Sequence, residues 1–148
     1  VNSRSKGARG ERMWRDQLRE AGFKAIRGCQ HSARDADGTE APDVICPSLP
    51  GIHHEVKFVE DLNVRSAIEQ ANRDKKPHQI AVVPHKKKNV PWVVMLLLSD
   101  LDKILKRTDI KRRIFDIAVR CIGSDWVAVV QVDDWFRIIR ESDLVTEE

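Results

Sequence analysis

The chain of 148 residues is long enough to bury the core of one domain, and its 41% hydrophobic content favours a globular fold over disorder. Its three cysteines are odd in number and form no CxxC pair, which argues against a disulfide framework and favours a reducing cytoplasm. The basic, polar N-terminus and the lack of a membrane-length apolar run argue against secretion and against a membrane partner.

The net charge is only +3, but the charged residues are distributed unevenly along the chain. Residues 1–34 hold nine cations against three acids, whereas residues 35–62 hold seven acids against Lys57 alone. Such a pattern suits a metal-dependent enzyme that acts on a phosphate backbone, because cations can hold the polyanion while carboxylates hold the metal. Ordinary solvated charge is the alternative. The candidate DNA-binding residues are Arg4, Lys6, Arg9, Arg12, Arg34, Lys86, Lys87 and Lys88.

The N-terminal region predicts a mobile arm over residues 1–7 and an amphipathic helix from about 8 to 21. Trp14, Leu18 and Ala21 recur at helical spacing, and Gly22 ends the pattern. Glu11 falls at the edge of the apolar face and therefore needs a partner. That partner is either Arg12 or Arg15 in a salt bridge, or a metal site shared with acids elsewhere.

A central hairpin carries the strongest chemical signal. After a strand at 23–29 and a polar loop at 30–40, two short strands are expected at 41–45 and 53–58, joined by a Pro/Gly-rich turn. Glu55 and Lys57 share one strand face while Val56 and Phe58 point the other way, and Asp43 would arrive from the paired strand. Two carboxylates and an ammonium group could hold a hard divalent cation beside an amine that acts on water or phosphate. The simpler alternative is a solvated Glu–Lys pair on an edge strand.

The following segments predict a strand–helix–strand unit. Asn63 caps a helix whose Val64, Ala67, Ile68 and Ala71 form an apolar stripe flanked by Gln70. A buried strand at 79–84 and a basic loop at 85–89 come next. This order favours an α/β fold with a mixed central sheet flanked by helices.

The last third contains a weak internal repeat. Residues 92–106 align with residues 126–140 at a spacing of 34, and each copy predicts a strand that runs into an acid-capped helix. We expect these units to extend the sheet or to form a dimer surface, and residues 145–148 to be a frayed tail. The expected organisation is one domain over 1–148, with a core at 8–84 and a repeat extension at 91–141.

Four elements in order give the chain a recognisable resemblance. Lys6 to Arg12 (KGARGER), Pro42-Asp43-Val44, Glu55-Val56-Lys57 and then Gln70 on the next helix resemble the archaeal-type Holliday junction resolvases of the PD-(D/E)xK nuclease superfamily. The resemblance covers about residues 5–84, and the length and duplicated C-terminal unit look like bacteriophage members of this group. It implies a restriction-endonuclease-like fold and favours an active site over a solvated surface pair.

The resemblance also implies roles for individual residues. Asp43, Glu55, Glu11 and the backbone carbonyl of Val56 would bind Mg²⁺, for which Mn²⁺ can substitute. Lys57 would orient or help to deprotonate the attacking water, and Gln70 would support the site from its helix. The implied activity is Mg²⁺-dependent hydrolysis of DNA phosphodiester bonds, with four-way junctions as substrate, by a homodimer in the cytoplasm of a bacterium or a phage-infected cell.

Several alternatives stay open. A repair or restriction-type nuclease acting on duplex or flapped DNA has the same chemistry, and a non-catalytic DNA-binding module has the same charge. Ser32 is more simply a turn residue than a catalytic serine. His53 could support the site and His54 faces the core. A zinc site built from Cys29, His31 and Cys46 has no recognised spacing.

Overall fold

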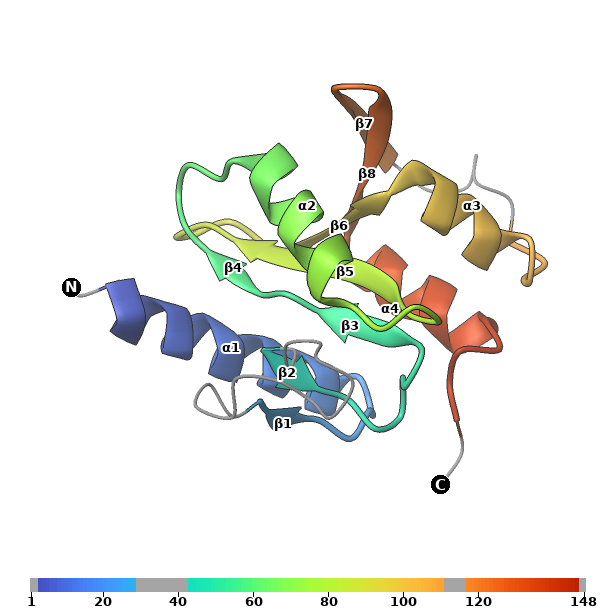
Figure 1. Ribbon diagram of the computed structural model, residues 1–148. Coiled ribbons are helices and arrows are strands. Elements are labelled where there is room, and N and C mark those ends of the chain that lie inside the picture. Colours follow the sequence, from blue (N-terminus) through green and yellow to red (C-terminus); the bar gives the residue numbers. More distant parts are fainter. Residues whose placement is uncertain (1–2, 29–42, 111–116, 147–148) are drawn as a thin grey trace.

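The structure is a computed structural model that describes residues 3–28, 43–110 and 117–146. Figure 1 shows the helices and strands in chain order. They are α1 (Ser3–Glu20), β1 (Ile26–Arg27), β2 (Val44–Ile45), β3 (Ile52–His54), β4 (Lys57–Phe58), α2 (Val64–Asp74), β5 (Ile80–Lys86), β6 (Val93–Leu97), α3 (Leu98–Leu105), β7 (Ile117–Ile122), β8 (Asp125–Gln131) and α4 (Val132–Glu141).

The expected α/β fold with a mixed central sheet is confirmed. The strands follow the order β1-β2-β3-β5-β6-β8-β7, and β4 also pairs with β5. β3 and β4 run parallel to β5, whereas the remaining pairs are antiparallel. The pairs Ile52↔Ile80 and Lys57↔His85 have the same register offset, so β3 and β4 lie along β5 as one run. Glu55 and Val56, between them, therefore keep the side-chain alternation of a strand.

Helices cover both faces of the sheet, because successive side chains of β5 point to opposite faces and are buried on both. Ala81 and Val83 pack with the apolar stripe of α2, whose cap Asn63 accepts a hydrogen bond from the Ser66 N–H at 3.0 Å. Val82 points to the larger core on the opposite face, which α1, α3 and α4 supply with side chains. Figure 1 shows α2 in front of β5 and α1 along the other side of β3 and β4.

Helix α1 is longer than the sequence predicts. It begins at Ser3, so the expectation of a mobile arm through residue 7 is wrong. Phe58 explains the extension: the Lys6 Nζ and the Arg9 guanidinium carbon lie 5.1 and 5.9 Å from its ring centroid, and these cation–π contacts hold the first turns on the sheet. Gly10 lets the helix approach, because a Cβ there would come 2.7 Å from the Phe58 Cβ.

Replacing Gly10 by Ala is expected to destabilise the protein by about 1–3 kcal/mol, because Phe58 or α1 must shift to accommodate the added methyl group. Gly7 on the same helix is the matched control, since a Cβ there meets nothing within 4 Å. Gly7→Ala should stabilise the helix by about 0.5–1 kcal/mol. Urea unfolding of the two variants measures both effects, and equal stabilities would contradict the close approach of α1 to β4.

The C-terminal repeat extends the sheet, as predicted. β6 runs into α3 and β8 runs into α4, and the two strands pair directly with each other. The helices are not acid-capped, however. Their N-cap residues Leu97 and Gln131 make no hydrogen bond from the side chain to the helix. The acids lie in the first turn instead, where their negative charge interacts favourably with the positive end of the helix dipole. β7 was not predicted. Of the strand expected at 23–29, residue 29 lies outside the described residues, and among residues 23–28 only β1 is a strand.

Two further expectations about segment ends are wrong. The tail is not frayed at Thr146, whose N–H donates to the Ser48 carbonyl at 3.0 Å. The basic loop starts later than residue 85, because β5 continues through Lys86 in pairing with β4. Among the helices that the structure describes, none combines the length and the apolar character needed to cross a membrane.

Candidate active site

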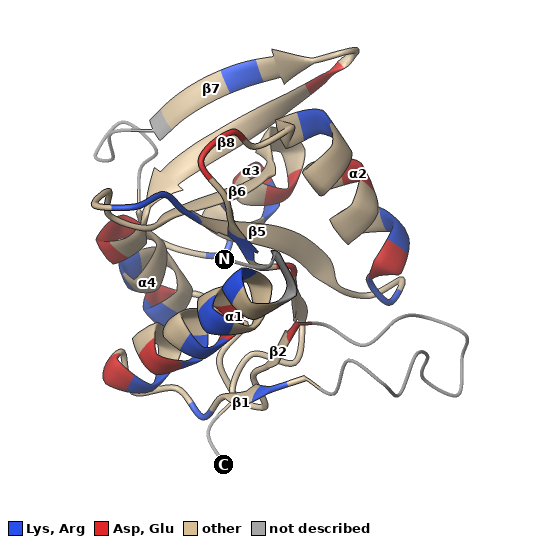
Figure 2. Cartoon of the chain, turned by 90° about the vertical axis from the view of Figure 1, so that its left-hand side faces the viewer, with Lys and Arg blue, Asp and Glu red and all other residues tan. Residues whose placement is uncertain are grey.

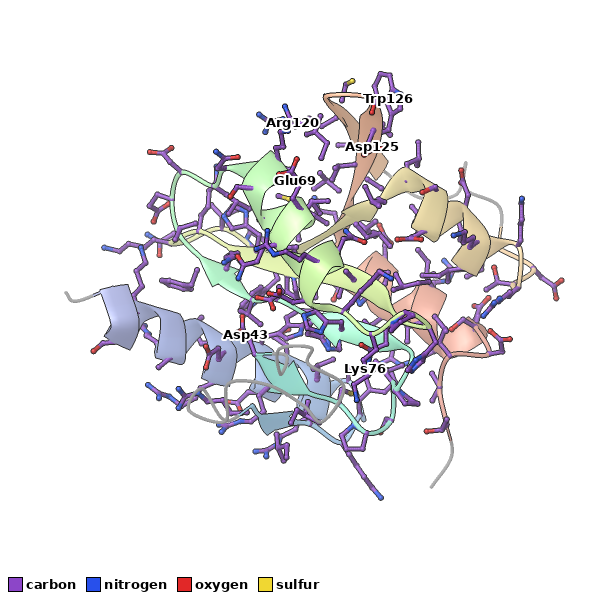
Figure 3. All side chains as sticks on the ribbon, viewed as in Figure 1. Asp43, Glu69, Lys76, Arg120, Asp125 and Trp126 are labelled. Atoms are coloured by element: carbon purple, nitrogen blue, oxygen red, sulfur yellow. The ribbon has the colours of Figure 1, made fainter. Side chains whose placement is uncertain are left out.

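The backbone fixes Asp43 at the point where three strands meet. Its N–H donates to the His54 carbonyl at 3.1 Å, and its own carbonyl accepts from the Gly28 N–H at 2.9 Å. The carboxylate accepts a hydrogen bond of 2.8 Å from the Val56 N–H. Asp43 thus sits beside the Glu55–Lys57 segment, as the hairpin interpretation predicts, and it lies between α1 and the centre of the sheet (Figure 3).

Strand alternation separates the core side chains from the polar ones in this segment. Ile52 and Val56 belong to the core on the α1 face. Glu55 and Lys57 therefore project to the opposite face, towards α2. There the Lys57 Nζ donates to Gln70 Oε1 at 3.0 Å. This contact from α2 holds the Lys57 ammonium group in place. In the sequence, only the position of Gln70 on the helix that follows Lys57 suggests it.

Asp43 has a strongly perturbed ionisation. Burial, the neighbouring Glu55 and, less strongly, Glu11 raise the pKa of Asp43 to about 8, against the opposing effects of the Val56 N–H and Lys57. Three acids therefore share a region that favours an added positive charge. A raised carboxyl pKa of this kind in a cluster of charged groups is typical of functional sites.

Glu11 takes a partner that the sequence analysis missed. Its side chain is 5% exposed, and Oε2 accepts a hydrogen bond of 2.7 Å from the Arg27 Nε. Neither Arg12 nor Arg15 is this partner; Arg15 instead donates to Asp16. No local pattern points to Arg27, because sixteen residues separate it from Glu11 and only the docking of α1 on β1 brings the two together.

The two neighbouring histidines have different surroundings. His53 Nε2 lies 3.0 Å from Glu55 Oε1, and both side chains are almost fully buried. His54 points into the core near Trp14. Burial and, less strongly, the neighbouring His53 lower the pKa of His54 to about 3. His54 is therefore neutral at physiological pH. His53 contacts Glu55 directly, in line with their shared strand face.

The donor set fits a hard divalent cation by type. Across residues 3–28, 43–110 and 117–146, no three His, Cys, Asp or Glu side chains are grouped so as to hold a metal ion. Glu11 is instead engaged by Arg27 and Glu55 by His53. Mg²⁺ needs fewer protein ligands, since it keeps several waters and binds through one or two carboxylates. Asp43 and Glu55 are two carboxylates of this type, and a bound cation would relieve the repulsion that Glu55 exerts on an ionised Asp43.

Most of the described candidate DNA-binding side chains line one cleft. A cavity of about 690 Å³ between α1 and the β5–β6 loop is lined by Lys6, Arg9, Arg12, Lys86 and Lys88. Figure 2 marks the Lys and Arg positions of α1 and of this loop in blue. Lys87 instead lines a separate pocket. The side chain of Arg4, together with Cys29, His31, Ser32 and Arg34, lies outside the described residues.

Comparison with solved structures finds distant similarity in fold. No family model and no curated protein matches the sequence. The chain is similar in structure to Hjc, a Holliday junction resolvase from the archaeal hyperthermophile Archaeoglobus fulgidus, with 17% sequence identity and a TM-score of 0.49 over 89% of this chain and 96% of that chain. A similarity this distant assigns no function.

Proposed function

We propose that the chain is a metal-dependent endonuclease that hydrolyses DNA phosphodiester bonds, with four-way junctions as its preferred substrate. The observation that carries the proposal is the buried carboxyl of Asp43, which shares its surroundings with Glu55, Glu11 and Lys57 and has a pKa raised to about 8. The basic cleft along α1 is lined by Arg12 and Phe58, the chain neighbours of Glu11 and Lys57, and it offers cations to the phosphate backbone. The junction preference and a homodimer that cuts two equivalent strands rest on the motif resemblance.

Each residue has a chemical role in this proposal. Asp43, Glu55 and the Val56 carbonyl would hold Mg²⁺ or Mn²⁺, with Glu11 joining if it leaves Arg27. The ion, when bound, supplies positive charge to the scissile phosphate and lowers the pKa of water. Lys57, held by Gln70 at 3.0 Å, donates a hydrogen bond to the attacking water or to a phosphate oxygen. The Val56 N–H keeps the Asp43 carboxylate oriented.

Cleavage of a labelled four-way junction, beside a linear duplex and a flap of matching sequence, tests the proposal in Mg²⁺ and in Mn²⁺. Lys57→Met should reduce cleavage by about 10²–10⁴-fold without abolishing binding, because it removes one positioned donor. Lys106→Met is the control, since Lys106 is exposed beyond the end of α3. Paired symmetric cuts in the junction alone support a resolvase.

The other outcomes distinguish the alternatives. Equal cleavage of all three substrates would keep the catalytic site but indicate a general repair or restriction-type nuclease. Intact DNA binding without cleavage by the wild-type protein in either metal would overturn the catalytic proposal in favour of a DNA-binding module. Salt-dependent binding is expected in every case and therefore separates none of them.

A further inference from the structure

We propose that an apolar pocket on the Lys57 face of the sheet binds an unstacked nucleobase of the DNA strand held at the proposed active site. The inference rests on the proposed function, since it assigns part of the same substrate to a second site. The pocket measures about 320 Å³, which is the lower end of the size range of small-molecule sites. It therefore suits a single planar group better than a peptide segment or a second protein.

The lining of the pocket matches a nucleotide in its distribution of charge. Leu62, Val93 and Met95 form apolar walls, and the cations Lys87 and Arg120 line the same pocket from exposed positions. An apolar interior with cations at its mouth is complementary to an uncharged base attached to a phosphate. Figure 3 shows Arg120 on the β7–β8 hairpin, projecting towards the side of α2.

His85 adds a polar edge without adding charge. Its Nε2 lies 2.8 Å from the Val59 carbonyl, which can only accept a hydrogen bond, so Nε2 carries the proton. Burial lowers the pKa of His85, and Lys87 lowers it further, so the ring is neutral and Nδ1 keeps its lone pair. A neutral ring suits contact with a base.

The loop between β5 and β6 separates this pocket from the basic cleft. Lys86, Lys88 and Asn89 line the cleft, whereas Lys87, Val90 and Pro91 line the pocket. The loop is held in shape: the Lys86 ammonium donates to the carbonyls of Lys87 and Val90, and the Lys88 N–H donates to Glu60 Oε1 at 3.0 Å. A strand whose phosphates contact the cleft can therefore cross the loop and place a base in a preformed pocket.

The pocket lies close to the proposed catalytic lysine. His85 is the register partner of Lys57, so the two side chains lie on the same face of adjacent strands. Along α2, Gln70 contacts Lys57 while Val64 lines the pocket, and six residues of helix span about 9 Å. This separation places the pocket within reach of a nucleotide neighbouring the scissile phosphate. Extrusion of a base is easiest where pairing is already interrupted, as at a branch point.

The exposed side chain of Val90 is a second feature that indicates a ligand in this pocket. It is 43% exposed, which is high for an apolar side chain, and it lies at the pocket on a loop whose residue Asn89 adopts a positive φ of 59°. An exposed Val on a constrained loop is explained if a ligand covers it. Val90→Glu changes this surface without disturbing the core. Ile26→Glu is the matched control, because Ile26 is 53% exposed on β1, at the far end of the sheet.

The test uses a four-way junction carrying 2-aminopurine at successive positions beside the branch point, bound by the non-cleaving Asp43→Asn protein. Fluorescence at protein saturation should rise about two-fold or more at one position, because unstacking relieves quenching of this base analogue. Adding Val90→Glu should remove most of the rise, whereas adding Ile26→Glu should not. Saturation makes the amplitude independent of any change in affinity.

Wild-type cleavage of the same junction in Mg²⁺ separates this inference from the proposed function. Cleavage without a fluorescence rise at any position, or a rise that Val90→Glu leaves intact, overturns the base pocket alone. A rise that depends on Val90, without cleavage, supports the pocket and overturns the catalytic proposal. Absence of both overturns both.

Discussion

Replacing Asp43 by Asn is expected to abolish cleavage while it stabilises the fold above neutral pH. The Asn side chain keeps an oxygen that accepts the 2.8 Å hydrogen bond from the Val56 N–H. It removes one carboxylate from a buried group of three, and with it a metal ligand of the proposed site. Cleavage should fall by about 10³-fold or more, because the charge stabilisation that a bound cation supplies is worth several kcal/mol.

The stability effect has a definite pH dependence. Below about pH 4 the Asp43 carboxyl is protonated in both the folded and the unfolded chain. Between about pH 4 and the folded-state pKa of about 8, Asp43 is ionised in the unfolded chain but still protonated in the folded chain. The free energy of unfolding therefore falls as pH rises through this range. Above about pH 8 both states are ionised and this contribution changes no further. The Asn variant has no ionisable group at this position. It should therefore be more stable than the wild type at pH 8.5 by several kcal/mol, because each unit of pKa difference between the folded and unfolded chain is worth about 1.4 kcal/mol.

Urea unfolding in a chelator at pH 4, 6 and 8.5 measures this difference. Asp125→Asn is the matched control, because Asp125 is exposed on the β7–β8 hairpin (Figure 3) and its replacement should leave the profile of the wild type unchanged. Adding Mg²⁺ at pH 8.5 should stabilise the wild type and not the Asp43 variant. A variant that loses cleavage yet keeps the wild-type pH profile would contradict the buried ionisation of Asp43.

The sequence was most informative where the chemistry follows local periodicity. Strand alternation placed Glu55 and Lys57 on one face and Val56 and Phe58 on the other, and the structure has this arrangement. Helical periodicity gave the buried face of α2, and the Asn63 cap fixed its start. These features depend on residues a few positions apart, whose relative directions the backbone dictates.

Features that depend on docking could not be predicted in the same way. The Arg27 partner of Glu11 and the Phe58 contacts that extend α1 arise between segments far apart in sequence. The loop residues Lys86 to Lys88 read as one cationic run, whereas the fold divides them between a basic cleft and an apolar pocket. Charge composition predicts that a patch exists, and only the turn geometry decides which side chains face the same partner.

Replacing His53 by Ala is expected to be strongly destabilising, because it leaves the Glu55 carboxylate buried without its 3.0 Å partner. Leaving a buried polar group without its hydrogen-bond partner costs about 1–3 kcal/mol, and more for a charged group such as a carboxylate. If His53 holds Glu55 for metal binding, cleavage measured at a temperature where the variant stays folded should also require more Mg²⁺. His78→Ala is the control, since His78 is exposed and should affect neither stability nor metal dependence.

A double-mutant cycle with Glu55→Gln separates this interaction from simple packing. Glu55→Gln removes the charge that His53 supports, so His53→Ala should cost less in that background, with an interaction energy of about 1–3 kcal/mol. His53→Gln, which keeps a donor, should recover part of the stability and of the Mg²⁺ response. Equal costs of His53→Ala in the two backgrounds would show that His53 only fills space, and Glu55 would then be oriented by the strand alone. An interaction energy together with an altered Mg²⁺ requirement would instead make the buried His–Glu pair part of the metal site, which a sequence of two adjacent histidines does not reveal.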